Sequence, residues 1–358
     1  MTTKNLSPEI LKTKQHFEIL DGLRGIAAVA IVLFHFMEMV YAFPENFIGH
    51  GFLAVDFFFC LSGFVIAYAY DDRIGTMGLK AFFISRLIRL HPLVILGSVL
   101  GLLAFLFDPF GGSPETYSTG KIILIFLCSL LMIPFPVITE RSFNLFGINA
   151  PAWSLFWEYV ANILYAFILS RLKRSTLLVL ALVAAVTLSY VSYRAEGLLG
   201  GWSGSNFWDG GARIAYSFLA GMLIFRYNWI IKSNLGFIGI SVLLSLAFLM
   251  PFSKWNWLTE LLVVLFYFPL VVALGAGAKL ADGVRKFCIF SGKISYPLYM
   301  THYAVIWMFL NYYTSHKPAT GQLALIISAG TVLLIGIAYL VMVIYDIPVR
   351  RYFSNKRK

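Results

Sequence analysis

Two ionisable side chains, Arg24 and His35, lie eleven residues apart in the first long apolar segment of the chain. At 3.6 residues per turn this spacing makes almost three whole turns of an α-helix, so both side chains fall on one face about 16 Å apart. Glu38 follows three residues later and shares that face. A histidine beside a carboxylate can act as a general base that the carboxylate orients. We therefore expect His35 and Glu38 to be catalytic.

Each of these residues also has a purely structural interpretation. Arg24 could be an anchor whose long side chain reaches the membrane surface. His35 could satisfy a hydrogen bond between two helices. The alignment of Arg24, His35 and Glu38 on one face favours catalysis over these separate explanations.

Arg86 and Arg89 are three residues apart, point the same way on a helix, and precede His91 and Pro92. Two guanidinium groups on one face suit a pyrophosphate or a 3′-phosphate. The alternative, anchoring by the positive-inside rule, is favoured by spacing alone. The spacing therefore leaves phosphate binding and anchoring both open for Arg86 and Arg89.

Further polar residues lie within apolar runs, where each ionisable group costs at least a few kcal/mol and is a candidate for function. Asp56 is the one charge in an aromatic run, and either pairs with a basic residue on a neighbouring helix or belongs to the site. Glu158 must pair across the bundle or titrate. We expect Glu158 to be catalytic and predict substrate contacts for Asp56, Trp153, Tyr296 and His302; the last two belong to a stripe at helical spacing with Ser295 and Tyr299.

Composition indicates the environment in which these residues act. Hydrophobic residues make up 59% of the 358 residues and charged residues only 13%, against about 25% charged in a typical soluble domain. The net charge of +11 comes from Lys and Arg in short connections and at the C-terminus, a distribution that fixes membrane topology. A nucleic-acid partner is therefore not expected, because no basic face on a soluble domain is visible.

Eleven apolar runs approach the length of about 20 residues that crosses a bilayer. The basic loops between the runs are expected to be cytoplasmic, as are both ends of the chain. These assignments are consistent with one another only if the chain crosses the membrane an even number of times. The weakest run, 121–137, is short and contains Pro134 and Pro136. We therefore expect an all-α polytopic integral membrane protein with about ten transmembrane helices. The candidate runs are 23–42, 51–70, 84–107, 121–137, 151–170, 176–192, 213–229, 235–251, 258–276, 294–313 and 322–345.

The expected organisation is a cytoplasmic N-terminal segment (1–18), one transmembrane domain (19–348) and a basic cytoplasmic tail (349–358). The first 18 residues are polar, which argues against a cleaved signal peptide. Cys60, Cys128 and Cys288 lie in or beside apolar runs without a metal or disulfide spacing, and are expected to be inert buried thiols.

Taken together, these motifs resemble the acyltransferase-3 family of membrane O-acyltransferases. They occur in family order and cover essentially the whole chain. Two departures are mild: Ala54 stands where Gly is common, and Asp346 where Glu is common. The matching features are Arg24-x10-His35, the run from Gly51 to Phe64, Arg86-x2-Arg89 with His91-Pro92, Trp153-Ser154-Leu155-x2-Glu158, Ser295-Tyr296-Pro297-Leu298-Tyr299-x2-His302 and Asp346-x-Pro348.

The resemblance implies a cytoplasmic acyl-CoA donor, O-acylation of an envelope glycan, a lipid-linked saccharide or a small hydroxylated metabolite, and a place in a cell inner membrane. Arg24, His35, Arg86 and Arg89 match the functional pairs of the family, and the resemblance implies that Arg24, Arg86 and Arg89 bind the phosphates of the donor. We expect acetyl-CoA to be the donor substrate, with no permanently bound cofactor and no metal. The expected partners are the donor, the saccharide acceptor and the lipid bilayer.

The predicted mechanism is direct transfer in a ternary complex, with His35 removing the proton of the acceptor hydroxyl. A covalent acyl-enzyme on Ser62, Ser154 or Cys60 stays open, although no local spacing supplies a base. The rival interpretation is a transporter or exporter of a small molecule, which buried charges on helices would also suit. The arginine pair and the lack of an internal repeat favour the enzyme over the transporter. A scaffold is a third, weaker alternative, because structure alone would not need so many buried ionisable groups.

Overall fold

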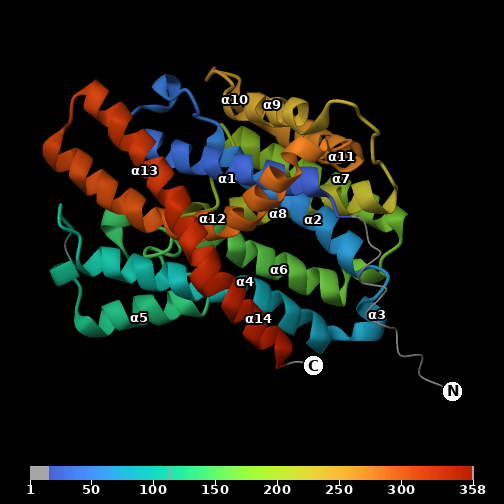
Figure 1. The fold of residues 1–358 in the computed structure, drawn as a ribbon, viewed down its shortest axis with the longest axis horizontal. Helices are drawn as coiled ribbons and strands as arrows, with labels where there is room; N and C mark the ends of the chain where they lie inside the picture. The colour runs from blue at the N-terminus through green and yellow to red at the C-terminus, as the bar shows by residue number, and fades with distance from the viewer. Residues whose placement is uncertain (1–15, 113, 357–358) are drawn as a thin grey trace.

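The computed structural model describes residues 16–112 and 114–356, and these residues form an all-helical protein (Figure 1). Most of the predicted 1–18 segment therefore lies outside the described residues. π-helical turns join α10 to α11 (Val263–Tyr267) and α13 to α14 (Met342–Asp346). The α-helices are α1 (Glu18–Glu38), α2 (Ala54–Tyr70), α3 (Ile74–Met77), α4 (Leu79–Leu106), α5 (Thr119–Leu130), α6 (Ala152–Phe167), α7 (Arg174–Arg194), α8 (Phe207–Arg226), α9 (Gly236–Phe248), α10 (Asn256–Leu262), α11 (Phe268–Gly277), α12 (Asp282–His316), α13 (Thr320–Val341) and α14 (Ile347–Asn355).

Six of the described helical segments are long and apolar enough to cross a membrane. Each can satisfy its backbone hydrogen bonds internally, as a lipid environment requires. The protein is therefore a polytopic membrane protein of helical type. The six segments are Glu18–Glu38, Gly51–Tyr70, Leu79–Leu106, Arg174–Arg194, Asn256–Gly277 and Thr320–Asn355.

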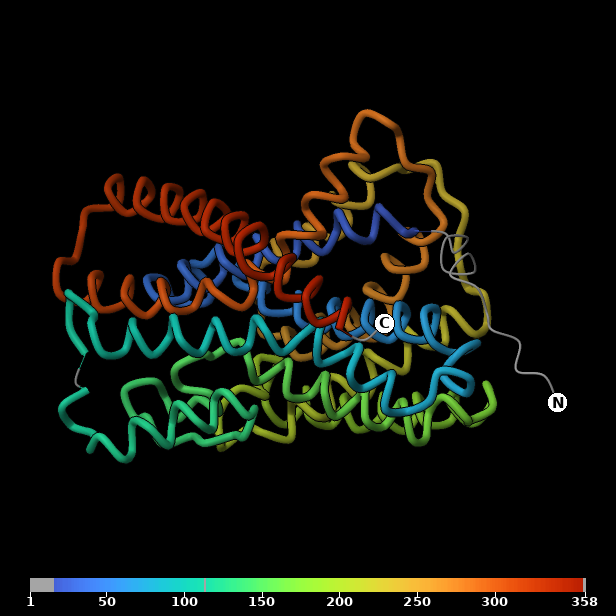
Figure 2. Tube along the Cα trace, turned by 60° about the horizontal axis from the view of Figure 1, so that its bottom comes forward, coloured from blue at the N-terminus to red at the C-terminus, as the bar shows by residue number. Residues whose placement is uncertain are grey.

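The helices form a bundle in which α1, α2, α8 and α12 lie between α9 to α11 on one side and α4 with α5 on the other (Figure 1). α1 packs along α12, and α2 packs against α8. The start of α1 and the end of α14 lie toward the same end of the molecule (Figure 2). The two ends of the described chain are thus brought together around one cavity.

Two elements differ from or refine the sequence expectations. α12 begins at Asp282, whereas the apolar run in the sequence begins near 294. A helix can continue beyond the bilayer, and its first turns can then carry charged residues. One of these, Arg285, pairs with Glu18 at 2.8 Å. α5 has 12 residues, about 18 Å of helix, which is shorter than the hydrocarbon core. Pro134 and Pro136 lie after it, in an irregular segment, as the weakness of the 121–137 run suggested.

That irregular segment is hydrogen-bonded to a second irregular segment, the connection between α7 and α8. The Leu145 amide donates to the Trp202 carbonyl at 2.9 Å, and Phe135 donates to Leu145 at 2.8 Å. Asn144 and Ser203 form an antiparallel bridge. Non-helical backbone is tolerated in such a protein where protein groups cover its polar atoms, and these pairs do so.

Glycines allow the close crossing of α2 and α8. A Cβ atom on Gly63 would stand 2.0 Å from the Phe218 carbonyl oxygen, and one on Gly221 would stand 1.9 Å from the Cys60 carbonyl oxygen. Both contacts are with backbone, which cannot move aside as a flexible side chain could. Gly63 and Gly221 therefore permit the close contact of the two helices.

Gly63→Ala is expected to destabilise the protein by about 1–3 kcal/mol, because the added methyl group forces α2 and α8 apart. The measurement is the midpoint of thermal unfolding in detergent. Gly75→Ala is the matched control, because a Cβ atom there meets nothing within 4 Å. An equal midpoint for the Gly63 and Gly75 variants would contradict the close-packing argument.

Candidate active site

A cavity of about 420 Å³ opens between α1, α2, α4, α6, α12 and the start of α14. It gathers residues that are far apart in the sequence, because the first turns of α1, the first half of α12 and the start of α14 meet there. Of the ten site residues predicted from the sequence, five line it: Arg24, Arg86, Arg89, Glu158 and Tyr296. The expectation that Arg86 and Arg89 point the same way is confirmed by this shared lining.

The cavity lining carries an excess of positive charge. Five cationic side chains line it, Arg24, Arg86, Arg89, Lys293 and Arg350, together with three carboxylates, Asp21, Glu158 and Asp346. Asp21 lies 3.5 Å from Arg24, and Asp346 pairs with Arg350. Within the ranges that the structure describes, neither Arg89 nor Lys293 has an ion-pair partner. Such a lining suits an anionic ligand, because its positive charges are only partly compensated.

Glu158 connects three helices at the wall of this cavity. Its Oε1 accepts a hydrogen bond from Arg86 at 2.8 Å and another from the Ser62 hydroxyl at 3.0 Å. Of the two alternatives for this carboxylate, the structure shows pairing across the bundle. The contact also gives Ser62 a neighbouring carboxylate that no local spacing in the sequence had indicated.

Two lining residues of the cavity, Tyr299 and Ser154, hydrogen-bond to each other through their hydroxyls at 2.7 Å. Tyr299 is next to His302, with 6.0 Å between their ring centroids. His302 is fully buried, and its Nδ1 contacts the Tyr299 carbonyl of its own helix at 2.8 Å. His302 itself is not among the cavity-lining residues.

His35 is separated from the cavity lining by His302, which lies beside Tyr299. Its Nδ1 contacts Glu38, as the spacing predicted. Its ring stacks on His302 at 5.4 Å and meets the edge of Tyr303 at 4.8 Å. His35 is not part of the cavity lining. If the cavity were rigid, a donor bound at its arginines would therefore not reach His35. Tyr299 and His302 lie between the arginines and His35.

Asp56 and Trp153 surround a buried arginine away from the cavity. Both oxygens of Asp56 bind Arg213, at 2.6 and 3.1 Å, and both side chains are essentially inaccessible. Trp153 lies over the Arg213 guanidinium at 5.2 Å. Pairing of Asp56 with a basic residue on a neighbouring helix, one of the two sequence alternatives, is what the structure shows. Substrate contact by Asp56 or Trp153 stays a prediction.

Sequence reasoning assigned no site role to Asp21, Lys293, Asp346 or Arg350, although all four line the cavity. From the sequence alone, a charged residue near the end of a membrane helix can indicate either a binding site or the topology of the helix, so these four residues could not be assigned. Asp346 had been noted only as part of a family motif. The fold was needed to show that charges at the two ends of the described chain share one wall.

Comparison with known proteins adds to this geometry. A family model described as an acyltransferase domain matches residues 17–344. A protein of Rhizobium radiobacter named as protein 2 in the picA locus is 36% identical over 184 residues, which are 48% of this chain and 93% of that protein. Two Staphylococcus aureus proteins, from strains COL and N315, are 40% identical over 88 residues, which are 24% of this chain and 13% of theirs; their names assign a provisional O-acetyltransferase activity. No solved structure matches the chain.

Proposed function

This chain belongs to the acyltransferase-3 family, and we propose from that premise that it moves an acetyl group from cytoplasmic acetyl-CoA to a hydroxyl of an envelope glycan or lipid-linked saccharide. The observation that carries the donor assignment is the cationic cavity. Arg86 and Arg89 face it from one helix, and Arg24 faces it from α1. Guanidinium groups bind phosphate oxygens through paired hydrogen bonds, and CoA carries three phosphates.

The proposed topology places this cavity toward the cytoplasm. Ten crossings with both ends cytoplasmic, in a cell inner membrane, would put the start of α1, the start of α12 and the end of α14 on the donor side. The basic residues near these ends support that orientation. α5 would then be the run that does not cross.

In the proposed transfer, His35 accepts the proton of the acceptor hydroxyl as its oxygen attacks the thioester carbonyl carbon. A C–O bond forms, the C–S bond breaks, and the CoA thiolate takes up a proton. The contact of Glu38 with Nδ1 leaves Nε2 as the accepting nitrogen. Because Tyr299 and His302 lie between the cavity lining and His35, we propose that the hydrogen bond between Tyr299 and Ser154 opens to admit the acetyl end of the donor.

Glu158 keeps a proposed catalytic role through the groups that it holds. It orients Arg86 toward the donor and accepts the hydrogen bond of Ser62. A Ser62 acyl-enzyme is the alternative route that this contact brings within geometric reach. Tyr296, whose hydroxyl donates to the Leu90 carbonyl at 2.7 Å, lines the cavity between α4 and α12 as a positioning residue. His302 is proposed to support the ring of His35.

The variant Arg86→Ala/Arg89→Ala is expected to bind acetyl-CoA about a hundredfold more weakly, because two hydrogen-bonding contacts to charged phosphates are lost. Binding is measured with radiolabelled acetyl-CoA and purified protein in nanodiscs. Arg89→Ala is the cleaner single variant, since Arg86 also pairs with Glu158. Lys80→Ala, an exposed cation on the same helix outside the cavity, is the control.

Two results would overturn the donor assignment. If the wild-type protein does not bind acetyl-CoA, the donor proposal is wrong and a transporter becomes the better explanation of the buried charges. If the wild type binds and the Arg89 variant binds equally well, the phosphates lie elsewhere in the protein.

A further inference from the structure

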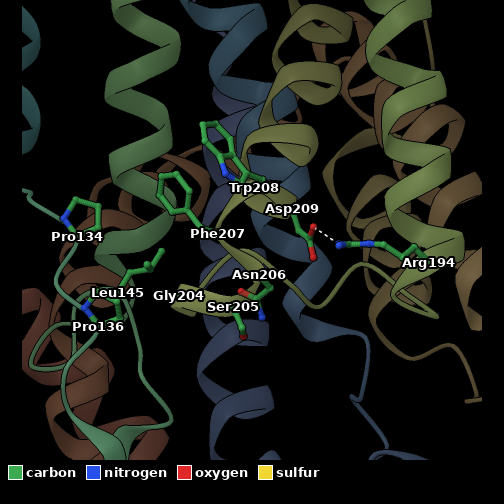
Figure 3. A pocket seen from close by; sticks show the side chains of 10 residues that line it. All are labelled: Pro134, Pro136, Leu145, Arg194, Gly204, Ser205, Asn206, Phe207, Trp208 and Asp209. Atoms are coloured by element: carbon green, nitrogen blue, oxygen red, sulfur yellow. Dashed lines mark hydrogen bonds and ion pairs between the residues drawn. The ribbon is translucent and has the colours of Figure 1, made fainter.

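A second hollow, an open groove of about 360 Å³, lies where α8 begins (Figure 3). Its walls come from the two hydrogen-bonded irregular segments of the chain. Pro134, Pro136 and Leu145 form one wall. The second wall is formed by Gly204, Ser205 and Asn206 of the α7–α8 connection and by Phe207, Trp208 and Asp209, the first residues of α8. Because the 2.9 Å bond from Leu145 to Trp202 ties these segments together, the groove is part of the folded structure.

One wall of the groove is an aromatic surface. Trp208 is 76% exposed, a high value for the largest apolar side chain. Phe207 supports it at 5.1 Å between ring centroids, and the buried Trp157 of α6 packs against both rings at 4.8 and 5.9 Å. The exposed indole is therefore held from behind and presents a broad face to a ligand.

The groove also carries hydrogen-bonding groups beside its aromatic wall. Asp209 and Arg194 form an ion pair at 2.5 Å, with half of the Arg194 side chain exposed (Figure 3). The side-chain oxygen of Asn206 accepts the amides of Gly201 and Ser203, each at 2.9 Å. With its oxygen engaged in this way, the Asn206 amide nitrogen is the group that this side chain has left to offer a ligand as a donor. Acceptors and donors thus stand beside an aromatic face.

We propose that this groove binds a saccharide unit of the acceptor, next to the unit that receives the acetyl group. The C–H face of a pyranose ring would stack on the electron-rich face of Trp208, and its hydroxyls would meet the Arg194–Asp209 pair and Asn206. A few directed polar groups beside an aromatic wall are typical of a small-ligand site. The inference rests on the proposed glycan acceptor and locates a second contact with it.

The fold links this groove to the donor cavity through α6. Ser154, Leu155 and Glu158 line the cavity, whereas Trp157, between them on the helix, packs under the aromatic wall of the groove. The Arg213 guanidinium also donates to the Gly200 carbonyl at 2.7 Å. The buried Asp56–Arg213 pair therefore holds the connection from which the groove is built.

An interfacial anchor is the competing explanation of an exposed tryptophan, since tryptophan is enriched at membrane surfaces. An anchor needs lipid contact only, and its replacement would leave saccharide binding unchanged. Trp255, at the start of α10, is an exposed tryptophan outside the groove and provides the matched control.

The test uses the full-length protein in nanodiscs and saturation-transfer NMR with soluble oligosaccharides released by mild acid from the envelope of the source cells. Wild type and Trp255→Ala are expected to transfer saturation to the sugars. Trp208→Ala should raise the half-saturating sugar concentration at least about fivefold, and Trp208→Phe, which keeps an aromatic face, should lie between them.

Acetyl-CoA binding is measured in the same samples, and it also reports whether each variant is folded. No saturation transfer in the wild type, or equal transfer in the Trp208→Ala variant, with acetyl-CoA binding intact, overturns the groove proposal alone. Absence of acetyl-CoA binding in the wild type instead overturns the proposed function. The expected pattern, weaker sugar binding with unchanged acetyl-CoA binding, separates the groove from an anchor.

Discussion

Replacing His35 with alanine is expected to lower acetyl transfer by about 10²–10⁴-fold, because a positioned general base contributes that much to the rate. Acetyl-CoA binding should remain, since His35 does not line the cavity in which the phosphates are proposed to bind. The measurement combines radiolabelled acetyl-CoA binding with release of free CoA by the purified protein, with water as a slow acceptor. Binding without turnover is the signature of a lost base.

Two further variants make the His35 experiment specific. Glu38→Gln should reduce turnover less than His35→Ala, because it leaves the base in place and keeps a side chain of the same shape against it. His316→Ala changes an exposed histidine near the far end of α12 and should leave turnover unchanged. Wild-type turnover by the His35→Ala protein would remove this residue from the mechanism. Attention would then move to Glu158 and Ser62, which share the cavity wall.

Removing Asp56 is expected to destabilise the protein by about 3–5 kcal/mol, because Asp56→Ala leaves the buried Arg213 guanidinium without its counter-charge. Both side chains of the pair are inaccessible, so water cannot replace the lost contact. Arg213→Ala should have an effect of the same size for the reciprocal reason. The readout is thermal unfolding followed by intrinsic fluorescence in detergent.

The surface pair of Arg285 and Glu18 is the matched control for the buried pair. Arg285 is 58% exposed, and Arg285→Ala should cost less than about 1 kcal/mol. The double variant Asp56→Leu/Arg213→Met should be more stable than either single alanine variant, because two apolar side chains leave no unpaired charge. Equal unfolding midpoints for Asp56→Ala and Arg285→Ala would show that the buried pair does not hold this part of the fold.

The sequence alone determined the features that depend on composition and on local spacing. An apolar chain with few charges must fold as membrane helices, since lipid leaves no partner for exposed backbone groups. The contact of His35 with Glu38 was predictable because residues three apart on a helix are neighbours. The same rule placed Arg86 and Arg89 on one face. The family was also recognisable at this level, because its motifs keep their order along the chain.

Only the tertiary structure decided which charges meet. Arg86 reaches Glu158 from 72 residues away, and Asp56 reaches Arg213 from 157 residues away. Helical spacing says which face carries a charge, but not which helix packs against that face. The crossing of α2 and α8 at two glycines, for example, sets the approach of Asp56 to Arg213.

The cavity and the groove, likewise, could not be predicted from helical spacing. The helical spacing of Arg24 and His35 gave no indication that Arg24 lines the cavity whereas His35 lies outside it, behind Tyr299 and His302. The groove beside Trp208 depends on two irregular segments whose backbones pair across 57 residues of chain, from Leu145 to Trp202. Such pairing follows no helical period, so periodicity in the sequence could not reveal it. Local chemistry was set by spacing along single helices, whereas the shape of each site was set by contacts between segments distant in the chain.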